Sequence, residues 1–196
     1  ASDYGTTASS VDGREFQITN PQSGGLNQGA IYGNGRLVTS KVTGVTTSSQ
    51  NDGATWEFST QLGDSGQRRL TSPVFLNNRF YVIAYLEGTS GTTSLFSSPD
   101  GLQWSKIHQL PYTGHIGQFL GASEGKLFVG NGEVLEYSAD GGESWNSIDL
   151  PISSNYSYAE IRNVVFDGQK YWVTLGGGLP GTNHGATDFF SSPDLL

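Results

Sequence analysis

The sequence has no cysteine and no methionine among its 196 residues, and only 14% of its residues are charged. Without cysteine, neither a disulfide bond nor a thiolate metal site can form. The chain also lacks any apolar run of the roughly 18 residues that a membrane-spanning helix needs, and no segment has the apolar periodicity of a helix. It begins ASDYGTTASS, with no initiator methionine and no visible signal peptide. We therefore expect a mature or excised segment that does not insert into a membrane.

Glycine and aromatic residues are plentiful instead. There are 28 glycines, and 12% of the residues are aromatic, a composition typical of an all-β protein with many turns. The formal net charge is -8, which disfavours nucleic acid and other polyanions as partners because phosphate binding needs a basic surface. A local basic pair at Arg68 and Arg69 remains compatible with this charge.

One short turn sequence recurs along the chain. Its copies are SVDGREF (10–16), SSQNDGATW (48–56), SSPDGLQW (97–104), SADGGESW (138–145) and SSPDLL (191–196). The aspartates at 12, 52, 100, 140 and 194 follow one another at intervals of 40, 48, 40 and 54 residues. Five copies at about 40 to 50 residues match the repeat length of one propeller blade.

The segments before these turns repeat as well. Two apolar strands joined by a Gly, Asn or Asp turn occupy residues 29–41, 73–86, 118–130 and 163–175, a hairpin pattern. A third strand leads into each aspartate turn and a fourth leaves it, so each unit has four short antiparallel strands. The predicted fold class is an all-β propeller of four-stranded antiparallel blades.

The predicted domain is a single propeller, or propeller segment, over residues 1–196. Its parts are a partial blade at 1–20, blades at about 21–60, 61–108 and 109–150, and a partial blade at 151–196. Either the two partial blades join and close a small four-bladed ring, or the chain is part of a larger propeller.

The turns resemble the Asp-box, the S-x-D-x-G-x-[ST]-W signature of the bacterial neuraminidase repeat in sialidase-like propellers. Ser138, Asp140, Gly142, Ser144 and Trp145 match it at every position, whereas Asn51 replaces the aspartate in the second copy. The resemblance implies that the aspartate accepts backbone N–H bonds, that glycine supplies positive φ, and that the tryptophan packs between sheets. The residues given this structural role are Asp12, Asp52, Trp56, Asp100, Trp104, Ser138, Asp140, Gly142, Trp145 and Asp194.

Candidate ligand-binding residues lie where propeller sites usually are, at the starts of first strands and in the loops between second and third strands. They are Arg69, His115, Tyr156, Tyr158, Glu160, Arg162, Asn183 and His184. Tyrosine rings stack on sugars, and Arg and Glu bind hydroxyls. The competing interpretation is that these groups are ordinary solvated loop ends. The Arg-Ile-Pro motif of sialidases is absent, so we assign no catalytic residue, no metal and no cofactor.

The resulting expectation is a non-catalytic propeller for binding or adhesion, secreted or on the cell surface of a bacterium, in a setting such as a biofilm matrix. Its partner would be a glycan or another extracellular polymer, with a second propeller segment or another copy of the chain as a further partner, and no nucleic acid. The alternatives are a segment of a sialidase-like or other glycoside hydrolase, which needs paired carboxylates, and a scaffold for protein assembly.

Overall fold

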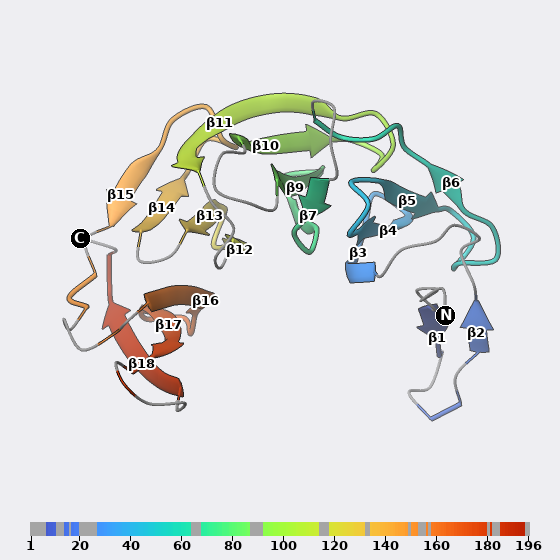
Figure 1. Ribbon diagram of the computed structural model, residues 1–196. Coiled ribbons are helices and arrows are strands. Elements are labelled where there is room, and N and C mark those ends of the chain that lie inside the picture. The colour runs from blue at the N-terminus through green and yellow to red at the C-terminus, as the bar shows by residue number, and fades with distance from the viewer. Residues whose placement is uncertain are drawn as a thin grey trace. The chain divides into compact units, whose positions relative to one another are not determined.

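The structure is a computed structural model of the whole chain, shown in Figure 1. The residues it describes are 7–10, 14–15, 17–19, 27–63, 68–86, 92–113, 118–131, 134–148, 150–152, 156, 158–179, 181 and 185–194. They divide into two compact units, Ala1–Gly114 and His115–Leu196. The regular structure of the described residues consists entirely of antiparallel β-strands, which confirms the predicted fold class.

The described residues of the first unit form three sheets. A two-stranded sheet pairs β1 (Thr7–Ser9) with β2 (Gln17–Thr19). The next sheet follows the chain in the order β3 (Asn27–Gly33), β4 (Arg36–Lys41), β5 (Thr46–Ser49) and β6 (Glu57–Phe58). The third sheet has β9 (Arg79–Leu86), β10 (Thr92–Ser98) and β11 (Ser105–Thr113), with β7 (Arg68–Leu70) and β8 (Val74–Leu76) both paired to β9.

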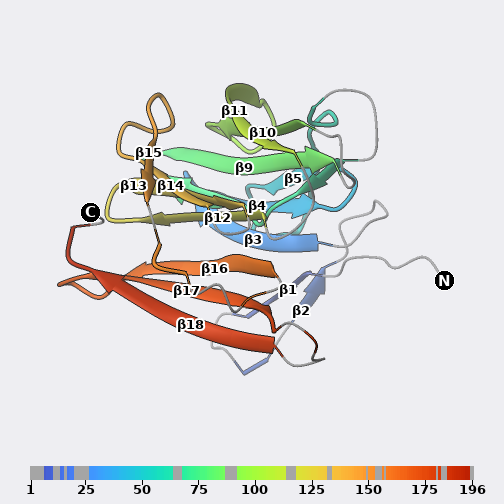
Figure 2. The same cartoon turned by 60° about the vertical axis from the view of Figure 1, so that its left-hand side comes forward.

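The second unit contains two sheets. One has the order β12 (Gln118–Ser123), β13 (Lys126–Asn131), β14 (Val134–Ser138) and β15 (Asn146–Ile148). The other has three strands, β16 (Tyr158–Phe166), β17 (Tyr171–Gly178) and β18 (Gly185–Ser192), which lie side by side in Figure 2. The four predicted hairpins are therefore β3–β4, β8–β9, β12–β13 and β16–β17.

Three of these hairpins close through two-residue turns in which both residues have positive φ. The pairs are Asn34-Gly35 (49° and 70°), Asn77-Asn78 (48° and 61°) and Glu124-Gly125 (47° and 73°). Positive φ at both positions is the geometry of a type I′ turn, whose twist matches that of the flanking strands. Asn and Gly tolerate this region best, which explains why the sequence marks these turns so clearly.

A second kind of turn begins at the serine that ends a strand, namely Ser49, Ser98, Ser138 and Ser192. At the first three of these serines the turn leads to the next strand of the same sheet, β6, β11 or β15. We call all four the serine–aspartate turns. In each, the serine Oγ donates to the side chain two residues later, at 3.0, 2.9, 2.7 and 3.0 Å respectively. At Ser138 the Asp140 carboxylate also accepts the amides of Glu143 and Ser144 at 3.0 and 2.9 Å. The chain reversal is thus stabilised by polar groups within the turn itself.

In the turn at Ser49 the accepting side chain is that of Asn51, not Asp52. Asn51 Oδ1 accepts the amide of Thr55 at 2.9 Å, and its Nδ2 donates to the Thr55 hydroxyl at 2.9 Å. Asp52, the residue expected in this turn from the sequence, is exposed and contributes a left-handed backbone with φ of 56°. An amide therefore fills the role that a carboxylate fills at Asp100 and Asp140.

The Asp140 carboxylate makes the stability of its turn dependent on pH. The Ser144 hydroxyl and amide, with the Ser138 hydroxyl, donate hydrogen bonds to the carboxylate and hold its pKa well below the ordinary 3.8. A carboxyl whose pKa is lower in the folded chain than in the unfolded chain stabilises the fold at pH values above its pKa in the unfolded chain. This stabilisation is lost as the pH falls through its pKa in the folded chain. We expect Asp140→Asn to lower the thermal midpoint at pH 7, by an amount that shrinks as the pH is lowered below 3.8. Thermal unfolding followed by circular dichroism measures both, and Asp52→Asn, which removes an exposed carboxylate from a neighbouring turn of the same kind, is the matched control.

Within the first unit, hydroxyl groups of the β3–β6 sheet bind the backbone of the β7–β11 sheet. Thr46 Oγ1 donates to the carbonyl of Gly101 at 2.7 Å, and Ser48 Oγ donates to that of Asp100 at 3.0 Å. Trp104 Nε1 donates to Thr46 Oγ1 at 2.8 Å. Gly101, with φ of 74°, lies so close to Val38 that a Cβ there would be 2.4 Å from its Cγ2. The serine–aspartate turn at Ser98 is thus docked against the neighbouring sheet.

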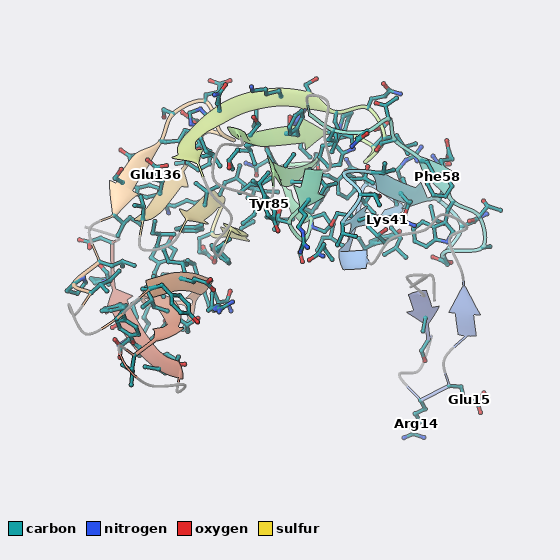
Figure 3. All side chains as sticks on the ribbon, viewed as in Figure 1. Arg14, Glu15, Lys41, Phe58, Tyr85 and Glu136 are labelled. Carbon is teal, nitrogen blue, oxygen red and sulfur yellow. The ribbon has the colours of Figure 1, made fainter. Side chains whose placement is uncertain are left out.

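Both units have an apolar core, and the first unit also buries many polar side chains. Its apolar cluster contains Leu62, Leu70, Val82, Ala84 and Phe96. Its buried polar residues are mostly short hydroxyl side chains, with one lysine: Thr39, Ser40, Lys41, Thr46, Thr47, Ser48, Ser49, Thr71, Thr93, Ser94, Ser97 and Ser98. Lys41 Nζ lies 5.7 Å from the centre of the Phe58 ring (both are labelled in Figure 3), and burial lowers the pKa of this lysine. In the second unit the buried cluster is aromatic and aliphatic: Phe128, Leu135, Ala159, Ile161, Val164, Tyr171, Val173 and Leu175.

Candidate functional site

The candidate site lies at the start of β16, where the register of the sheet shifts. Ile161 is opposite Leu175 and Asn163 is opposite Thr174, so Arg162 is the extra residue of a β-bulge. A bulge bends its strand and redirects the inserted side chain. The side chain of Arg162 lies against that of Glu160.

Glu160 and Arg162 form an ion pair in which one partner is buried and the other is exposed. Arg162 Nη2 lies 2.6 Å from Glu160 Oε2, with side-chain exposures of 59% and 11% respectively. Gly176 lies opposite Glu160 on β17, and a Cβ at this glycine would be 3.1 Å from Arg162 Nε. The missing side chain therefore leaves room for the arginine. Because a guanidinium has five N–H donors, the exposed part of Arg162 keeps donors for a ligand.

Tyr158 lies beside this pair on the same face. It is two residues before Glu160, and successive residues of a strand alternate between faces. Its side chain is 49% exposed. Its register partner on β17 is Gly178, and Gly178 in turn lies opposite Gly185 of β18. We call Tyr158, Glu160 and Arg162 the Glu160 face; it combines an aromatic ring, a fixed carboxylate and an exposed guanidinium over glycine-rich strands.

On the opposite face, Tyr156 reaches Asp188 across a glycine. Gly177 has no side chain, and a Cβ there would be 2.5 Å from Tyr156 Cδ1, so the tyrosine ring lies over this glycine. The Tyr156 hydroxyl donates a hydrogen bond to the Asp188 carboxylate, and this bond raises the pKa of Tyr156 above 10.0, with burial and the negative charge of Asp188 acting in the same direction. The bond attaches the segment before β16 to the edge strand β18.

Replacing Asp188 with asparagine should lower the pKa of Tyr156 towards 10.0 because the negative charge is removed. A tyrosine whose pKa is higher in the folded chain than in the unfolded chain stabilises the fold at pH values below its pKa in the unfolded chain. This contribution is lost as the pH rises through its pKa in the folded chain. The wild type should therefore lose more stability than Asp188→Asn between neutral pH and high pH. Carbon-13 NMR of labelled tyrosine gives the pKa of Tyr156 in both proteins. An unchanged Tyr156 titration would contradict the assignment.

Glu160 and Asp188 do not face each other. Glu160 is opposite Gly176 and Asp188 is opposite Leu175, and these neighbouring positions of β17 point to opposite faces. Glycosidase chemistry needs two carboxyl groups on either side of one bond. The two acidic side chains of this region therefore do not form such a pair.

The other residues singled out from the sequence are located as follows. Arg69 lies on β7 of the first unit, opposite Tyr85. His115, Asn183, His184 and Asp12 lie outside the described residues. Tyr171 and Trp172, which are neighbours on β17, are 5% and 36% exposed. In the described part of the chain, no three His, Asp or Glu side chains gather as metal ligands, and no described helix is long and apolar enough to cross a membrane.

A second polar cluster, at the β16–β17 turn, was not expected from the sequence. Trp172 Nε1 donates to Asp167 Oδ2 at 2.7 Å, and this bond, with the amides of Lys170 and Gln169, lowers the pKa of Asp167 to about 2. Lys170 Nζ lies 4.3 Å from the Trp172 ring centre. The string DGQKYW contained the turn signal, but nothing in it indicated that the indole would fold back onto the aspartate.

Successive antiparallel sheets, each built from consecutive strands of the chain, are the blade pattern of a β-propeller domain. The chain belongs to the family described as the DUF6242 beta propeller domain, which matches residues 5–192. No curated protein matches the chain.

Solved structures with this fold resemble the chain at low sequence identity. The GH74 xyloglucanase from Xanthomonas campestris is 16% identical, with a TM-score of 0.57 over 89% of this chain and 32% of its own. YCF48 from Cyanidioschyzon merolae is 16% identical, with a TM-score of 0.54 over 83% of this chain and 56% of its own. The Bacillus subtilis arabinanase Arb43A is 10% identical, with a TM-score of 0.53 over 84% of this chain and 71% of its own. These similarities support the propeller fold.

Proposed function

We propose that this chain is a non-catalytic binding propeller that recognises a glycan or matrix polymer at the Glu160 face, outside a bacterial cell or on its surface. The observation that carries the proposal is the exposed Arg162 guanidinium, held by buried Glu160 beside the exposed ring of Tyr158. A ligand with many hydroxyl groups and an apolar ring face matches both groups. The ring packs on the tyrosine, and the hydroxyls accept hydrogen bonds from the arginine.

The serine–aspartate turns support an exported adhesin-type propeller. Their sequence resembles the Asp-box of the bacterial neuraminidase repeat, and their hydrogen bonds are those that such a turn requires. The net charge of -8 favours a neutral polymer over a polyanion. We therefore infer a neutral polysaccharide, such as one found in a biofilm matrix, as the ligand class.

The alternative is that this chain is a segment of a glycoside hydrolase. The similar structures suggest it, since they include an arabinanase and a xyloglucanase. This alternative requires a facing carboxylate pair. Glu160 is paired with Arg162, and Asp188 binds Tyr156 on the opposite face. The described geometry therefore favours binding over hydrolysis.

The test is to titrate the full chain with soluble arabinan and xyloglucan by isothermal calorimetry. Tyr158→Ala should weaken binding about five- to tenfold through the loss of one stacking contact. Arg162→Gln should weaken it further because the charged donors are lost. The matched control is Tyr32→Ala, which removes a 63% exposed tyrosine from β3 of the first unit and should leave the affinity unchanged.

Two results would contradict the proposal. Equal effects of Tyr158→Ala and Tyr32→Ala, or no binding to either polymer, would remove the Glu160 face as the site. Release of reducing sugar from either polymer would establish hydrolysis and exclude a purely binding role.

A further inference from the structure

Asn34 and Gly35 form the exposed turn between β3 and β4. Both residues have positive φ, 49° and 70°, and no described atom lies within 4 Å of the place where a Cβ would stand on Gly35. Asparagine is a thermolabile residue, and a following glycine makes its side-chain amide easier to lose, because no side chain shields the next main-chain nitrogen. The turn that this hairpin uses therefore places a chemically reactive pair at the surface.

The side chain of Asn34 also joins two sheets of the first unit. Its Nδ2 donates to the main-chain carbonyl of Asn78, in the turn between β8 and β9, at 2.8 Å. The same nitrogen donates to the carbonyl of Pro99, in the serine–aspartate turn at Ser98, at 3.1 Å. A side-chain amide has two N–H donors, which match these two bonds. Because both acceptors are carbonyl oxygens, position 34 needs a donor, and a carboxylate cannot replace it.

Asn51, in another turn of the same sheet, has the opposite requirement. Its Oδ1 accepts hydrogen bonds from the Ser49 hydroxyl at 3.0 Å and the Thr55 amide at 2.9 Å. Its Nδ2 donates to the Thr55 hydroxyl, a group that can donate instead. An aspartate makes the corresponding bonds in the turns at Ser98 and Ser138. A carboxylate should therefore be tolerated at position 51 but not at position 34.

We propose that Asn34 is a site of spontaneous deamidation that is protected while the first unit is folded, and that its conversion to an acid weakens the contact between the β3–β6 and β7–β11 sheets. In the reaction, the main-chain nitrogen of Gly35 loses its proton to water and bonds to Asn34 Cγ. The Cγ–Nδ2 bond breaks, and the nitrogen takes up a proton and leaves as ammonia. Water then opens the cyclic imide at one of its two carbonyls, which gives aspartate or isoaspartate.

The folded turn opposes this reaction. Ring closure requires the Asn34 side chain to swing towards the Gly35 nitrogen and the main chain to rotate, whereas the two hydrogen bonds and the left-handed backbone hold both in place. The reaction then proceeds mainly from the open chain, and its rate follows the population of the open form. Because the product does not revert to asparagine, deamidation makes unfolding of the first unit irreversible.

The first test compares the deamidation rate of Asn34 in the folded and the unfolded chain. The full chain is incubated at mildly alkaline pH, in buffer and in urea that unfolds it, and mass spectrometry of proteolytic fragments follows the acid formed at position 34. The other Asn-Gly pair, Asn131-Gly132, gives the rate of an unfolded pair in the urea sample. Asn34 should match Asn131 in urea, and in buffer it should react at least about tenfold more slowly because two hydrogen bonds must open.

The second test measures the effect of the acid on the sheet contact. Asn34→Asp introduces the carboxylate directly, and Asn51→Asp is the matched control because it adds the same charge at an exposed turn of the same sheet. Urea unfolding is followed through fluorine-labelled Trp56 and Trp104. Asn34→Asp should raise the equilibrium constant of unfolding about five- to tenfold, because two carbonyls lose their donor. Asn51→Asp should leave this constant unchanged or lower it.

Two results would overturn the proposal. Equal deamidation rates of Asn34 in buffer and in urea would show that the fold does not protect the amide. Equal losses of stability for Asn34→Asp and Asn51→Asp would show that the sheet contact does not need a donor at position 34. The rate measurement uses the unaltered chain, so it decides the first point even if Asn34→Asp does not fold.

Discussion

Replacing Gly101 with alanine should strongly destabilise the first unit. The new Cβ would lie 2.4 Å from Val38 Cγ2 in a tightly packed sheet interface, and such overpacking costs about 1–3 kcal/mol. The φ of 74° adds about 1–2 kcal/mol because an L-residue is strained in the left-handed region. Urea unfolding followed through fluorine-labelled tryptophans gives separate signals for Trp56 and Trp104 of the first unit.

Two variants separate the steric cost from the backbone cost. Gly125→Ala has nearly the same φ, 73°, but nothing lies within 4 Å of its new Cβ, so it should show the backbone cost alone. Val38→Ala removes the clashing methyl groups, so the double variant Val38→Ala with Gly101→Ala should be more stable than the sum of the single effects predicts. Equal losses for Gly101→Ala and Gly125→Ala would show that the interface is loose at this point.

Replacing Phe128 with alanine should lower the stability of the second unit by about 3–5 kcal/mol. Phe128 is fully buried in β13. Its ring centre lies 6.3 Å from that of Tyr137 and 5.9 Å from that of Tyr171, so the ring joins the β12–β15 sheet to the β16–β18 sheet. The loss combines the removal of buried hydrocarbon with a cavity that the rigid sheets cannot fill. Trp145 and Trp172 report on this unit in the same urea experiment.

Phe189→Ala is the matched control, since it removes the same group from a 66% exposed position of the same unit. It should change stability by no more than about 0.5 kcal/mol. A comparable loss for both phenylalanines would mean that the β18 face is covered in solution, and a small loss for Phe128→Ala would contradict the assigned core.

The fold was predictable from sequence because its signals are local. The turns Asn34-Gly35 and Asn77-Asn78 require positive φ, and few residues tolerate it. The serine–aspartate turns satisfy their hydrogen bonds within a few residues, so their sequence alone reports their structure. Asn51 was recognisable as the substitute for aspartate, and its hydrogen bonds show why an amide is sufficient.

The candidate site was only partly predictable. Glu160, Arg162, Tyr156 and Tyr158 were chosen because they lie near the start of a first strand, a position that the repeat fixes. Glu160 and Arg162 are only two residues apart, but their arrangement also depends on Gly176, whose missing side chain leaves room for the arginine. The contact of Tyr156 with Asp188 passes over Gly177 and joins residues 32 apart, and one sequence carries no signal for such a separation.

The burial of Lys41 was not predictable for the same reason. In the sequence, RLVTSK reads as a strand with a charged end, whereas the lysine is fully buried beside Phe58. A terminal lysine in a strand usually faces solvent.

The chemical contrast between the two cores implies that the units respond differently to temperature. Unfolding the first unit exposes its apolar cluster together with many hydroxyl groups, and apolar surface raises the heat capacity of the unfolded chain whereas polar surface lowers it. The described buried residues of the second unit are almost all apolar. The heat-capacity change of unfolding per buried residue should therefore be smaller in the first unit than in the second.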